Sequence, residues 1–376
     1  RLADRDALEG LFEAQLALRG RIARHADCPD YRAYAFKLYQ RFDYGPAECE
    51  AFHRAVETSV VPLLRRLQAE RRRAMGLAAL RPWDLAVDPA GRPPLKPFAT
   101  AGELEERAAR LFRRLDPALG ARFDRMRELG LLSLENYKGK APGGYQETYA
   151  ERRLPFIFMN AVGTDQDVQT LVHEGGHAFH AFAARDHAVR AYRSTGAEFA
   201  EVASMGMELL ALPYLDEFYP DPEVRSRAVR ARLETIVEIL PWIAAVDAFQ
   251  HWIYTHPGHD REERRGAWVA LLERFGGDVD WSGFEPERAS LWHRQLHLFV
   301  CPFYYIEYGI AQLGALGLWR AARRDPAAAL AAYRRALALG GSRPLPELFA
   351  AAGLPFDLSE RTVAPLAEEL TRSLFG

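Results

Sequence analysis

The amino-acid sequence predicts a mainly α-helical fold with a small β-sheet. Apolar positions recur at the spacing of an amphipathic helix through most of the chain, whereas residues 154–163 form a short apolar run typical of a strand. The chain has 376 residues, of which 49% are hydrophobic and 27% charged. This is the composition of an ordinary globular protein, long enough for one large domain or for two to three smaller ones.

The expected helices are separated by segments rich in proline and glycine. Residues 81–97 are expected to form a surface connection and residues 138–145 a flexible glycine-rich loop, while Pro220-Asp221-Pro222 ends one helix before the next begins. A single repeat-like helix is expected at 326–339. The other expected helices span residues 4–24, 46–75, 101–130, 196–216, 222–255, 260–275 and 286–325.

The strand at 154–163 directly precedes the most distinctive helix of the chain. Thr164 or Asp165 is expected to cap that helix. The strand itself would either lie at the edge of the sheet and pair with an extended peptide, or lie inside the sheet without a ligand. The sequence leaves both arrangements open.

The run His-Glu-Gly-Gly-His at 173–177 predicts a metal site on this helix. Histidines four residues apart project from one helical face, so His173 and His177 can bind one Zn²⁺ together. Glu174 would lie beside the metal and act as a general base toward a zinc-activated water molecule. Two glycines inside a helix are costly, which indicates that another backbone comes close there. The alternative is a helix whose histidines satisfy only core hydrogen bonds.

A catalytic zinc site needs a third protein ligand, which acidic residues farther along the chain can supply. Glu198 and Glu201 both lie at suitable separations, and Glu208 follows Glu201 by seven residues on the same helical face. One acid can bind the metal while another accepts the free N–H of a ligating histidine. Position 183, where the metzincin pattern requires histidine, is alanine, and His180 points off the ligand face, which suggests a supporting or structural role. The alternative is that the acids are surface residues.

The charge and cysteine content exclude several functional classes. The formal net charge is −2, which provides neither a basic surface for nucleic acid nor a polybasic cluster for a membrane. No apolar run is long enough for a membrane-spanning helix. The three cysteines are scattered, which excludes a cysteine-based zinc cage and is typical of a reducing compartment, so we expect a cytoplasmic protein.

These motifs resemble those of the M3 peptidases, the thimet oligopeptidase/oligoendopeptidase F family. The family pattern is HExGH followed downstream by a glutamate in a Glu-x-x-Ser context, which residues 201–204 match. Further segments similar to the oligoendopeptidase branch extend the likeness over essentially the whole chain; they are residues 30–34, 41–44, 138–145, 155–163 and 339–346. Four further residues are expected either to contact the substrate or to support the metal ligands from behind: Gly143, Gly144, Glu208 and His297.

The resemblance implies a zincin-like, neurolysin/oligoendopeptidase-like helical catalytic domain with a small β-sheet and a deep substrate channel. It implies that residues 1–376 form the catalytic region, without the N-terminal helical region usual in the family. It favours Glu201 over Glu198 as the third ligand of one Zn²⁺ per chain. The implied activity is hydrolysis of peptide bonds in short oligopeptides. The alternatives are peptidyl-dipeptidase or carboxypeptidase-type trimming, and a non-catalytic helical interaction module with a structural metal site; no oligomeric state is predicted.

Peptide hydrolysis builds negative charge on the former carbonyl oxygen, so hydrogen-bond donors are expected beside the metal. Tyr305 and Tyr308 lie three residues apart on one helical face and resemble family tyrosines that stabilise this charge. Tyr304 is expected to pack instead. His297 is a candidate substrate contact, and His293 is expected to be structural. The alternative for each tyrosine is an ordinary core residue at a helix surface.

Overall fold

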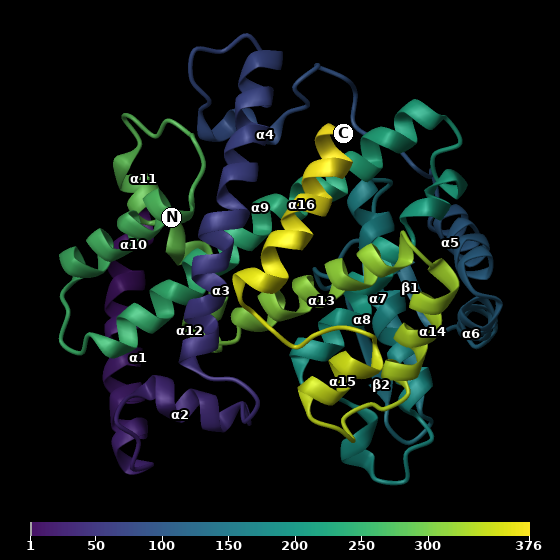
Figure 1. Cartoon of the computed structure of the whole chain (residues 1–376), viewed down its shortest axis with the longest axis horizontal. Helices are drawn as coiled ribbons and strands as arrows, with labels where there is room; N and C mark the ends of the chain where they lie inside the picture. The colour runs from purple at the N-terminus through teal and green to yellow at the C-terminus, as the bar shows by residue number, and fades with distance from the viewer. Residues whose placement is uncertain (1) are drawn as a thin grey trace. The chain divides into compact units, whose positions relative to one another are not determined.

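The computed structural model describes residues 2–376 and confirms a mainly helical chain with a small sheet (Figure 1). The chain forms two compact units. It passes between them four times, twice inside a helix, α9 (Pro222–Thr255) or α13 (Ile306–Ala322), so neither unit is a continuous stretch of sequence. The first unit contains the residues through Arg92 with Glu234–Gly309 and Asp357–Gly376, and the second contains Pro93–Leu233 and Ile310–Phe356.

Helices build the first unit. The predicted segment 4–24 is α1 (Arg5–His25), whereas the predicted segment 46–75 divides at Val60 into α3 (Pro46–Ser59) and α4 (Val61–Ala74). The division occurs because Pro62 lacks the N–H that would continue α3 and is tolerated only in the first turn of a new helix. The remaining helices of this unit are α2 (Tyr31–Leu38), α10 (Arg261–Phe275), α11 (Glu285–Ala289), α12 (Leu296–Val300), α16 (Glu360–Phe375) and most of α9. Two helices of this unit were not predicted, α2 and α16.

The second unit combines helices with the sheet. The predicted helix 101–130 is divided at Asp116, whose carboxylate accepts the N–H groups of Ala118 and Leu119 and so caps the following helix. The two most closely associated helices of this unit are the one that carries the His-Glu-Gly-Gly-His run and the next one. The helices of the unit are α5 (Ala101–Leu115), α6 (Pro117–Glu128), α7 (Asp165–Ala184), α8 (Ala197–Leu210), α14 (Pro326–Leu337) and α15 (Leu345–Ala351), with parts of α9 and α13.

The sheet has three strands in the order β1 (Leu132–Glu135), β3 (Leu154–Ala161) and β2 (Tyr145–Tyr149). β1 runs parallel and β2 antiparallel to β3. The predicted strand is therefore the internal one, which decides between the two arrangements left open by the sequence, and β2 lies at an edge. Burial alternates along the first six residues of β3, as expected for a pleated strand. α7 contacts both β2 and β3, so the sheet supports the helix that carries the two histidines.

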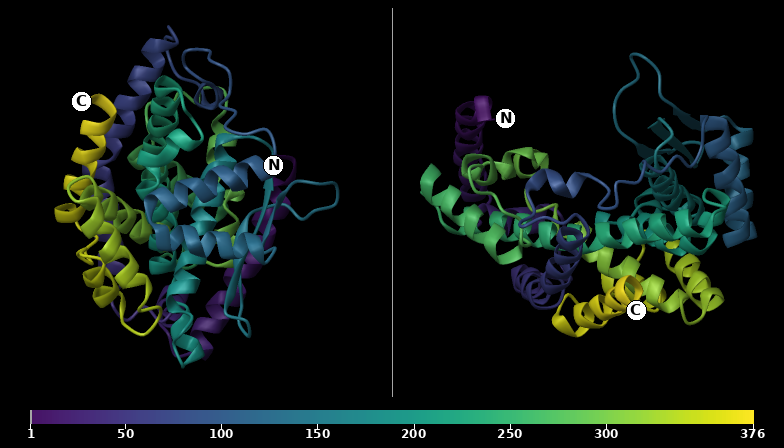
Figure 2. Two further views of the ribbon diagram at one scale, coloured as in Figure 1. Left: turned by 90° about the vertical axis from the view of Figure 1, so that its right-hand side faces the viewer. Right: turned by 90° about the horizontal axis from the view of Figure 1, so that it is seen from above.

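The glycine-rich segment between β1 and β2 is exposed and extends away from the helices of its unit (Figure 2). Lys140 anchors it. The Lys140 ammonium donates to the carbonyl oxygens of Ser133 at 3.0 Å, Glu135 at 2.7 Å and Met159 at 2.6 Å. The loop is thus tied to the strands beside it although most of its residues are exposed.

The predicted helix 286–325 is interrupted before α13 begins. Phe303 has φ 70°, a left-handed conformation that is rare for a bulky residue. The Gln250 amide oxygen accepts the Phe303 N–H at 2.5 Å, and Arg41 donates to the Phe303 carbonyl oxygen at 2.5 Å and to Glu307 at 2.7 Å. Arg41 and Glu307 form a buried ion pair. These polar contacts hold the turn that carries Tyr304 and Tyr305, directly before α13 with Tyr308.

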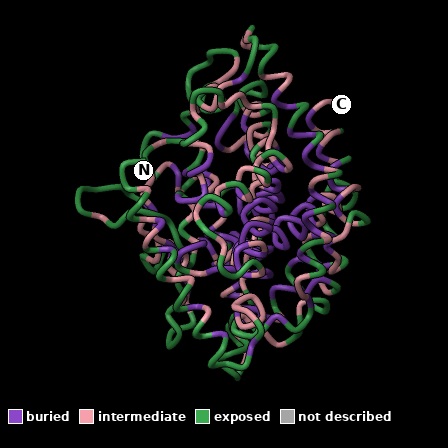
Figure 3. The backbone as a smooth tube through the Cα atoms, turned by 90° about the vertical axis from the view of Figure 1, so that its left-hand side faces the viewer, coloured by how far each residue is buried: buried purple, intermediate pink, exposed green. Residues whose placement is uncertain are grey.

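Buried and exposed stretches alternate along most helices, the pattern of amphipathic helices that cover a core (Figure 3). In the second unit the core includes an aromatic cluster beside α7: the ring of Phe112 lies 4.9 Å from that of Phe179 and 5.0 Å from that of Phe123. Within residues 2–376, no helix has both the length and the apolar character needed to cross a bilayer.

The backbones of α7 and α8 touch at Gly176. A Cβ atom added to Gly176 would lie 2.5 Å from the carbonyl oxygen of Ala203 and 2.6 Å from the Cα atom of Ser204. A Cβ atom on Gly175 would lie 2.8 Å from the ring of Phe112. Close packing thus requires both glycines, because no larger residue fits at this distance, and at Gly176 the neighbour is another backbone, as predicted.

We expect Gly176→Ala to destabilise the protein by about 1–3 kcal/mol, because the added methyl group forces α7 and α8 apart. Chemical denaturation measures this loss. Gly266→Ala on α10 is the matched control, since no atom lies within 4 Å of its added Cβ. In this control only the higher helix propensity of alanine affects stability, so the substitution should be neutral or stabilising by up to about 1 kcal/mol. Equal stability of the two variants would contradict the close packing of α7 against α8.

Candidate metal centre

α7 begins at a firmly capped N-terminus. Thr164 occupies the N-cap position, one of the two residues predicted for it. The Asp167 carboxylate accepts the N–H of Thr164 at 2.8 Å and that of Val162 at 2.9 Å. These bonds join the end of β3 to the first turn of α7 and so fix the direction in which His173 and His177 point.

Side-chain atoms of His173, His177 and Glu201 converge on one point. The Glu201 Oε2 atom lies 3.4 Å from Nε2 of His173 and 3.7 Å from Nε2 of His177, and all three ligand atoms lie within 4.8 Å of one another. Donor atoms bound tetrahedrally to one Zn²⁺ at about 2 Å are about 3.3 Å apart. The three side chains are 25%, 19% and 14% exposed, so the point of convergence is open to solvent on one side.

Glu201, rather than Glu198, takes part in this group. Both acids lie on α8, and the Ser204 hydroxyl donates to Glu201 Oε2 at 2.9 Å. Ser204 follows Glu201 by three residues and therefore lies on the same face of the helix. The hydroxyl orients the carboxylate toward the two imidazoles.

Glu208 holds His173 from the other side of its ring. The His173 Nδ1 atom lies 2.7 Å from Glu208 Oε1, and Arg232 forms an ion pair with the second oxygen of the same carboxylate. Because a carboxylate only accepts hydrogen bonds, the contact with Glu208 keeps a proton on Nδ1, and Nε2, which lies near Glu201, is the nitrogen that can exchange its proton for a metal ion. A histidine that binds a metal ion through Nε2 needs its ring proton on Nδ1.

Glu174 lies next to the metal-ligand group and is only 6% exposed. Burial raises the pKa of Glu174 to about 7. The backbone of Gln146, in the edge strand β2, lies beside the Glu174 carboxylate and acts to lower this pKa, but burial outweighs it. A carboxyl group with such a pKa can both accept and return a proton near neutral pH.

The two histidines respond differently to their surroundings. Burial lowers the pKa of His177 to about 4, so its ring is neutral at pH 7. Burial also acts to lower the pKa of His173, but hydrogen bonds to Glu201 and Glu208 outweigh it and raise that pKa to about 10. The two carboxylates therefore stabilise positive charge at this point of the chain, as a cation site requires.

Gly143 and Gly144 lie where the exposed loop enters β2. Gly143 has φ 103°, and its carbonyl oxygen accepts from the Asn160 amide at 3.0 Å. A Cβ atom on Gly144 would lie 2.9 Å from the Thr170 methyl group on α7, three residues before His173. Glycine lets the loop cross α7 at this point. Neither glycine belongs to the group of ligand atoms among the described residues.

The predicted tyrosines lie in the first unit, in a cluster with His297. The His297 Nε2 atom lies 3.3 Å from the Tyr308 hydroxyl, and the Gln295 amide donates to His297 Nδ1 at 2.7 Å. Since Nδ1 accepts, Nε2 carries the ring proton and donates to the phenol oxygen. The rings of Tyr305 and Tyr308 are 5.4 Å apart, and Tyr304 stacks on His297 at 5.8 Å. Tyr305 is buried, whereas Tyr304 and Tyr308 are half-exposed.

Two further histidines have surroundings that fit structural roles. His180 is buried, packs edge-to-face against Phe199 with ring centres 6.3 Å apart, and lies outside the metal-ligand group of the described residues. His293 is buried and lies 3.2 Å from a carboxylate oxygen of Glu9.

The model of peptidase family M3 matches residues 3–367. The chain belongs to peptidase family M3. Among the relatives of this M3 chain, oligopeptidase PepF of Bacillus subtilis (strain 168) is 26% identical over 266 residues, which cover 69% of this chain and 38% of PepF.

Solved structures show the same fold. One described as an oligoendopeptidase F is 31% identical, with a TM-score of 0.91, over 99% of this chain and 66% of that one. Pz peptidase A with an inhibitor is 30% identical, with a TM-score of 0.89, over 98% of this chain and 66% of that one. A third, described as an oligoendopeptidase F from Bacillus anthracis str. Ames, is 26% identical, with a TM-score of 0.85, over 99% of this chain and 64% of that one. The M3 chain thus spans less than two thirds of PepF and about two thirds of these structures.

Two groups that the structure of this M3 chain brings to the metal-ligand residues were not predicted from the sequence. Arg232 pairs with Glu208, and the backbone of Gln146 lies beside Glu174. A single arginine in an arginine-rich helix carries no sequence signal, and a backbone group carries none of any kind. Tyr304 was predicted to pack, and its ring stacks on that of His297 from the turn before α13.

Proposed function

We propose that this M3 chain is the catalytic part of a zinc-dependent oligoendopeptidase, which hydrolyses internal bonds of short oligopeptides. The observation that carries the proposal is the convergence of His173, His177 and Glu201 beside the buried carboxyl group of Glu174. Membership of family M3 supports the reaction class.

The proposed cofactor is one Zn²⁺ per chain, held by His173, His177 and Glu201. Two imidazole nitrogens and one carboxylate oxygen are a donor set of catalytic zinc sites, which keep one position open. When bound, the ion supplies Lewis acidity, which lowers the pKa of a water molecule and polarises the scissile carbonyl group. The partial exposure of the three side chains fits a site that substrate must reach.

Glu174 is the proposed general base and acid. It takes the proton of the attacking water molecule and returns it to the leaving amine. Its pKa of about 7 suits both steps. Glu208 and Arg232 position the His173 ring and take no part in proton transfer.

The edge strand β2 is the proposed partner of the substrate backbone. In the described sheet β2 pairs with β3 on one side only, and the backbone of its residue Gln146 lies beside Glu174. An extended peptide that pairs with such an edge forms hydrogen bonds between its main chain and that of the strand. Because these bonds do not involve side chains, this mode of binding suits substrates of varied sequence.

Tyr305 and Tyr308 are the proposed donors to the oxyanion, and His297 is a proposed substrate contact. The resemblance to the family supports these roles, as does the His297–Tyr308 contact, which orients the phenol. Free thiols at Cys28, Cys49 and Cys301 support a cytoplasmic location.

The proposal is tested with the purified chain and internally quenched fluorescent peptides of graded length. We expect cleavage that a chelator abolishes and Zn²⁺ restores, with fragments from internal bonds in mass spectra. Successive release of C-terminal dipeptides would instead establish peptidyl-dipeptidase action, and release of single residues carboxypeptidase action. A zinc-loaded chain that binds peptides but cleaves none of them would be the non-catalytic interaction module.

Glu174→Gln should lower turnover by about 10²–10⁴-fold, because the amide cannot accept the proton of the water molecule. Its zinc content should stay unchanged, since Glu174 is not a ligand. Glu106→Gln, at an exposed position of α5, is the control and should keep full activity. Wild-type turnover of the Glu174 variant would remove this residue from the mechanism.

Tyr308→Phe should lower kcat by about 10²–10³-fold with little change in zinc content, because one donor to the oxyanion is lost. Steady-state kinetics beside metal analysis measures both quantities. Tyr304→Phe removes a hydroxyl from the same cluster and should change kcat far less. An unchanged kcat in the Tyr308 variant would show that its phenol does not contact the reacting carbonyl group.

A further inference from the structure

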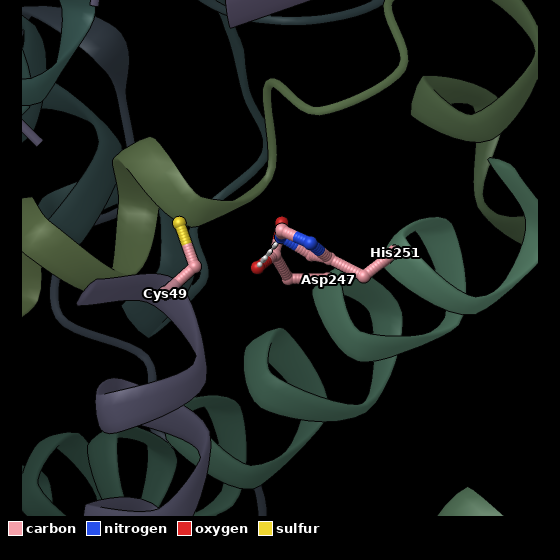
Figure 4. A group of neighbouring side chains, drawn as sticks. All are labelled: Cys49, Asp247 and His251. Carbon is pink, nitrogen blue, oxygen red and sulfur yellow. Dashed lines mark ion pairs between the residues drawn. The ribbon is translucent and has the colours of Figure 1, made fainter. Parts of the chain in front are cut away.

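A second cluster of metal-ligating side chains lies in the first unit, apart from the residues of the proposed catalytic mechanism. Cys49 comes from α3, and Asp247 and His251 come from α9 (Figure 4). Their ligand atoms lie within 4.8 Å of one another. We propose that this cluster binds a second Zn²⁺, with a structural role.

Each helix offers two polar side chains four residues apart, on one face. α3 carries Cys49 and His53, and α9 carries Asp247 and His251. The His53 Nε2 atom lies 2.8 Å from Asp247 Oδ2 and holds that oxygen in place. A four-coordinate site needs one further donor, which a water molecule or a shift of the His53 ring could supply.

The cluster is buried and incompletely satisfied. Cys49 and Asp247 are 0% exposed and His251 is 6% exposed. Within residues 2–376, Asp247 Oδ1 and His251 Nε2 have no hydrogen-bond partner, although His251 Nε2 lies 3.3 Å from Asp247 Oδ2. Buried polar atoms without partners are costly, and buried charges are found paired or bound to metal. An ion between these atoms would satisfy the carboxylate and the imidazole together.

The donor set selects zinc among the common divalent ions. A thiolate and an imidazole are poor ligands for Mg²⁺ and Ca²⁺, which prefer oxygen, and good ligands for Zn²⁺. On binding, the Cys49 thiol releases its proton to solvent. The charges of the thiolate, the Asp247 carboxylate and Zn²⁺ then sum to zero, which suits a cluster without solvent contact.

Arg32 competes with the metal for His251. Its guanidinium lies 3.3 Å from His251 Nδ1, and because a guanidinium only donates, this contact places the ring proton on Nε2. Zinc bound at Nε2 requires the proton on Nδ1 instead. Arg32→Gln should therefore tighten zinc binding by about tenfold, since the amide oxygen can accept the Nδ1 proton.

The test removes the proposed catalytic site first, in a chain with His173→Ala and His177→Ala, and then measures bound zinc and the cobalt spectrum. We expect one ion per chain and a thiolate-to-cobalt charge-transfer band. Cys49→Ala in this background should lose both the band and the ion. Cys28→Ala, which removes another buried free thiol, should keep both, and so should Cys301→Ala.

The results separate this proposal from the proposed function. If the double-histidine variant binds no metal while the wild type binds one ion, the second site is wrong and the catalytic site stands. Suppose instead that the double-histidine variant still binds one ion, that adding Cys49→Ala removes this ion, and that the wild type also binds only one. The proposed catalytic zinc site is then wrong. Should the Cys49 variant not fold, the cobalt spectrum of the double-histidine variant still decides, because a metal bound there without a thiolate band overturns the proposal.

Discussion

The contact between the backbones of α7 and α8 is the constraint on which the candidate metal centre depends. His173 and His177 belong to one helix and Glu201 to the other, so the distance between the helices decides whether their donor atoms meet. Gly176 lets the helices touch, with no room for a Cβ atom against Ala203. The glycine that weakens the helix locally is therefore the residue that brings the ligands within reach of one ion.

The charges around this centre are arranged in layers. Glu201 faces the two imidazoles directly, whereas Glu208 acts through the far nitrogen of His173 and is itself paired with Arg232. Because Glu208 contacts the nitrogen that faces away from Glu201, it holds a proton on that nitrogen without occupying the position proposed for the metal. Arg232 compensates the charge of Glu208, so this buried acid does not repel Glu201 at full strength. The arrangement favours a cation on the Glu201 side of the His173 ring and a proton on its Glu208 side.

Local features of the fold were predictable, and features set by distant contacts were not. The cap at Thr164, the strand before it and the histidine helix follow from neighbouring residues. The order of the sheet, with β3 inside, depends on pairing with β1 and β2, whose short sequences carry little signal. In the same way His173, His177 and Glu201 were found from spacing and family resemblance, whereas the interruption at Phe303 depends on contacts with residues far away in sequence.

The two clusters of donor atoms share a construction but differ in exposure. In each, one helix supplies two donors four residues apart and a second helix supplies the third. The side chains of the His173 group are 14–25% exposed, whereas the residues of the Cys49 group are 0–6% exposed. Catalysis needs an open coordination position that substrate and water can reach, and a structural ion needs a closed one. Exposure, rather than the number of donors, is therefore the reason for proposing catalysis at the first cluster and stabilisation of the fold at the second.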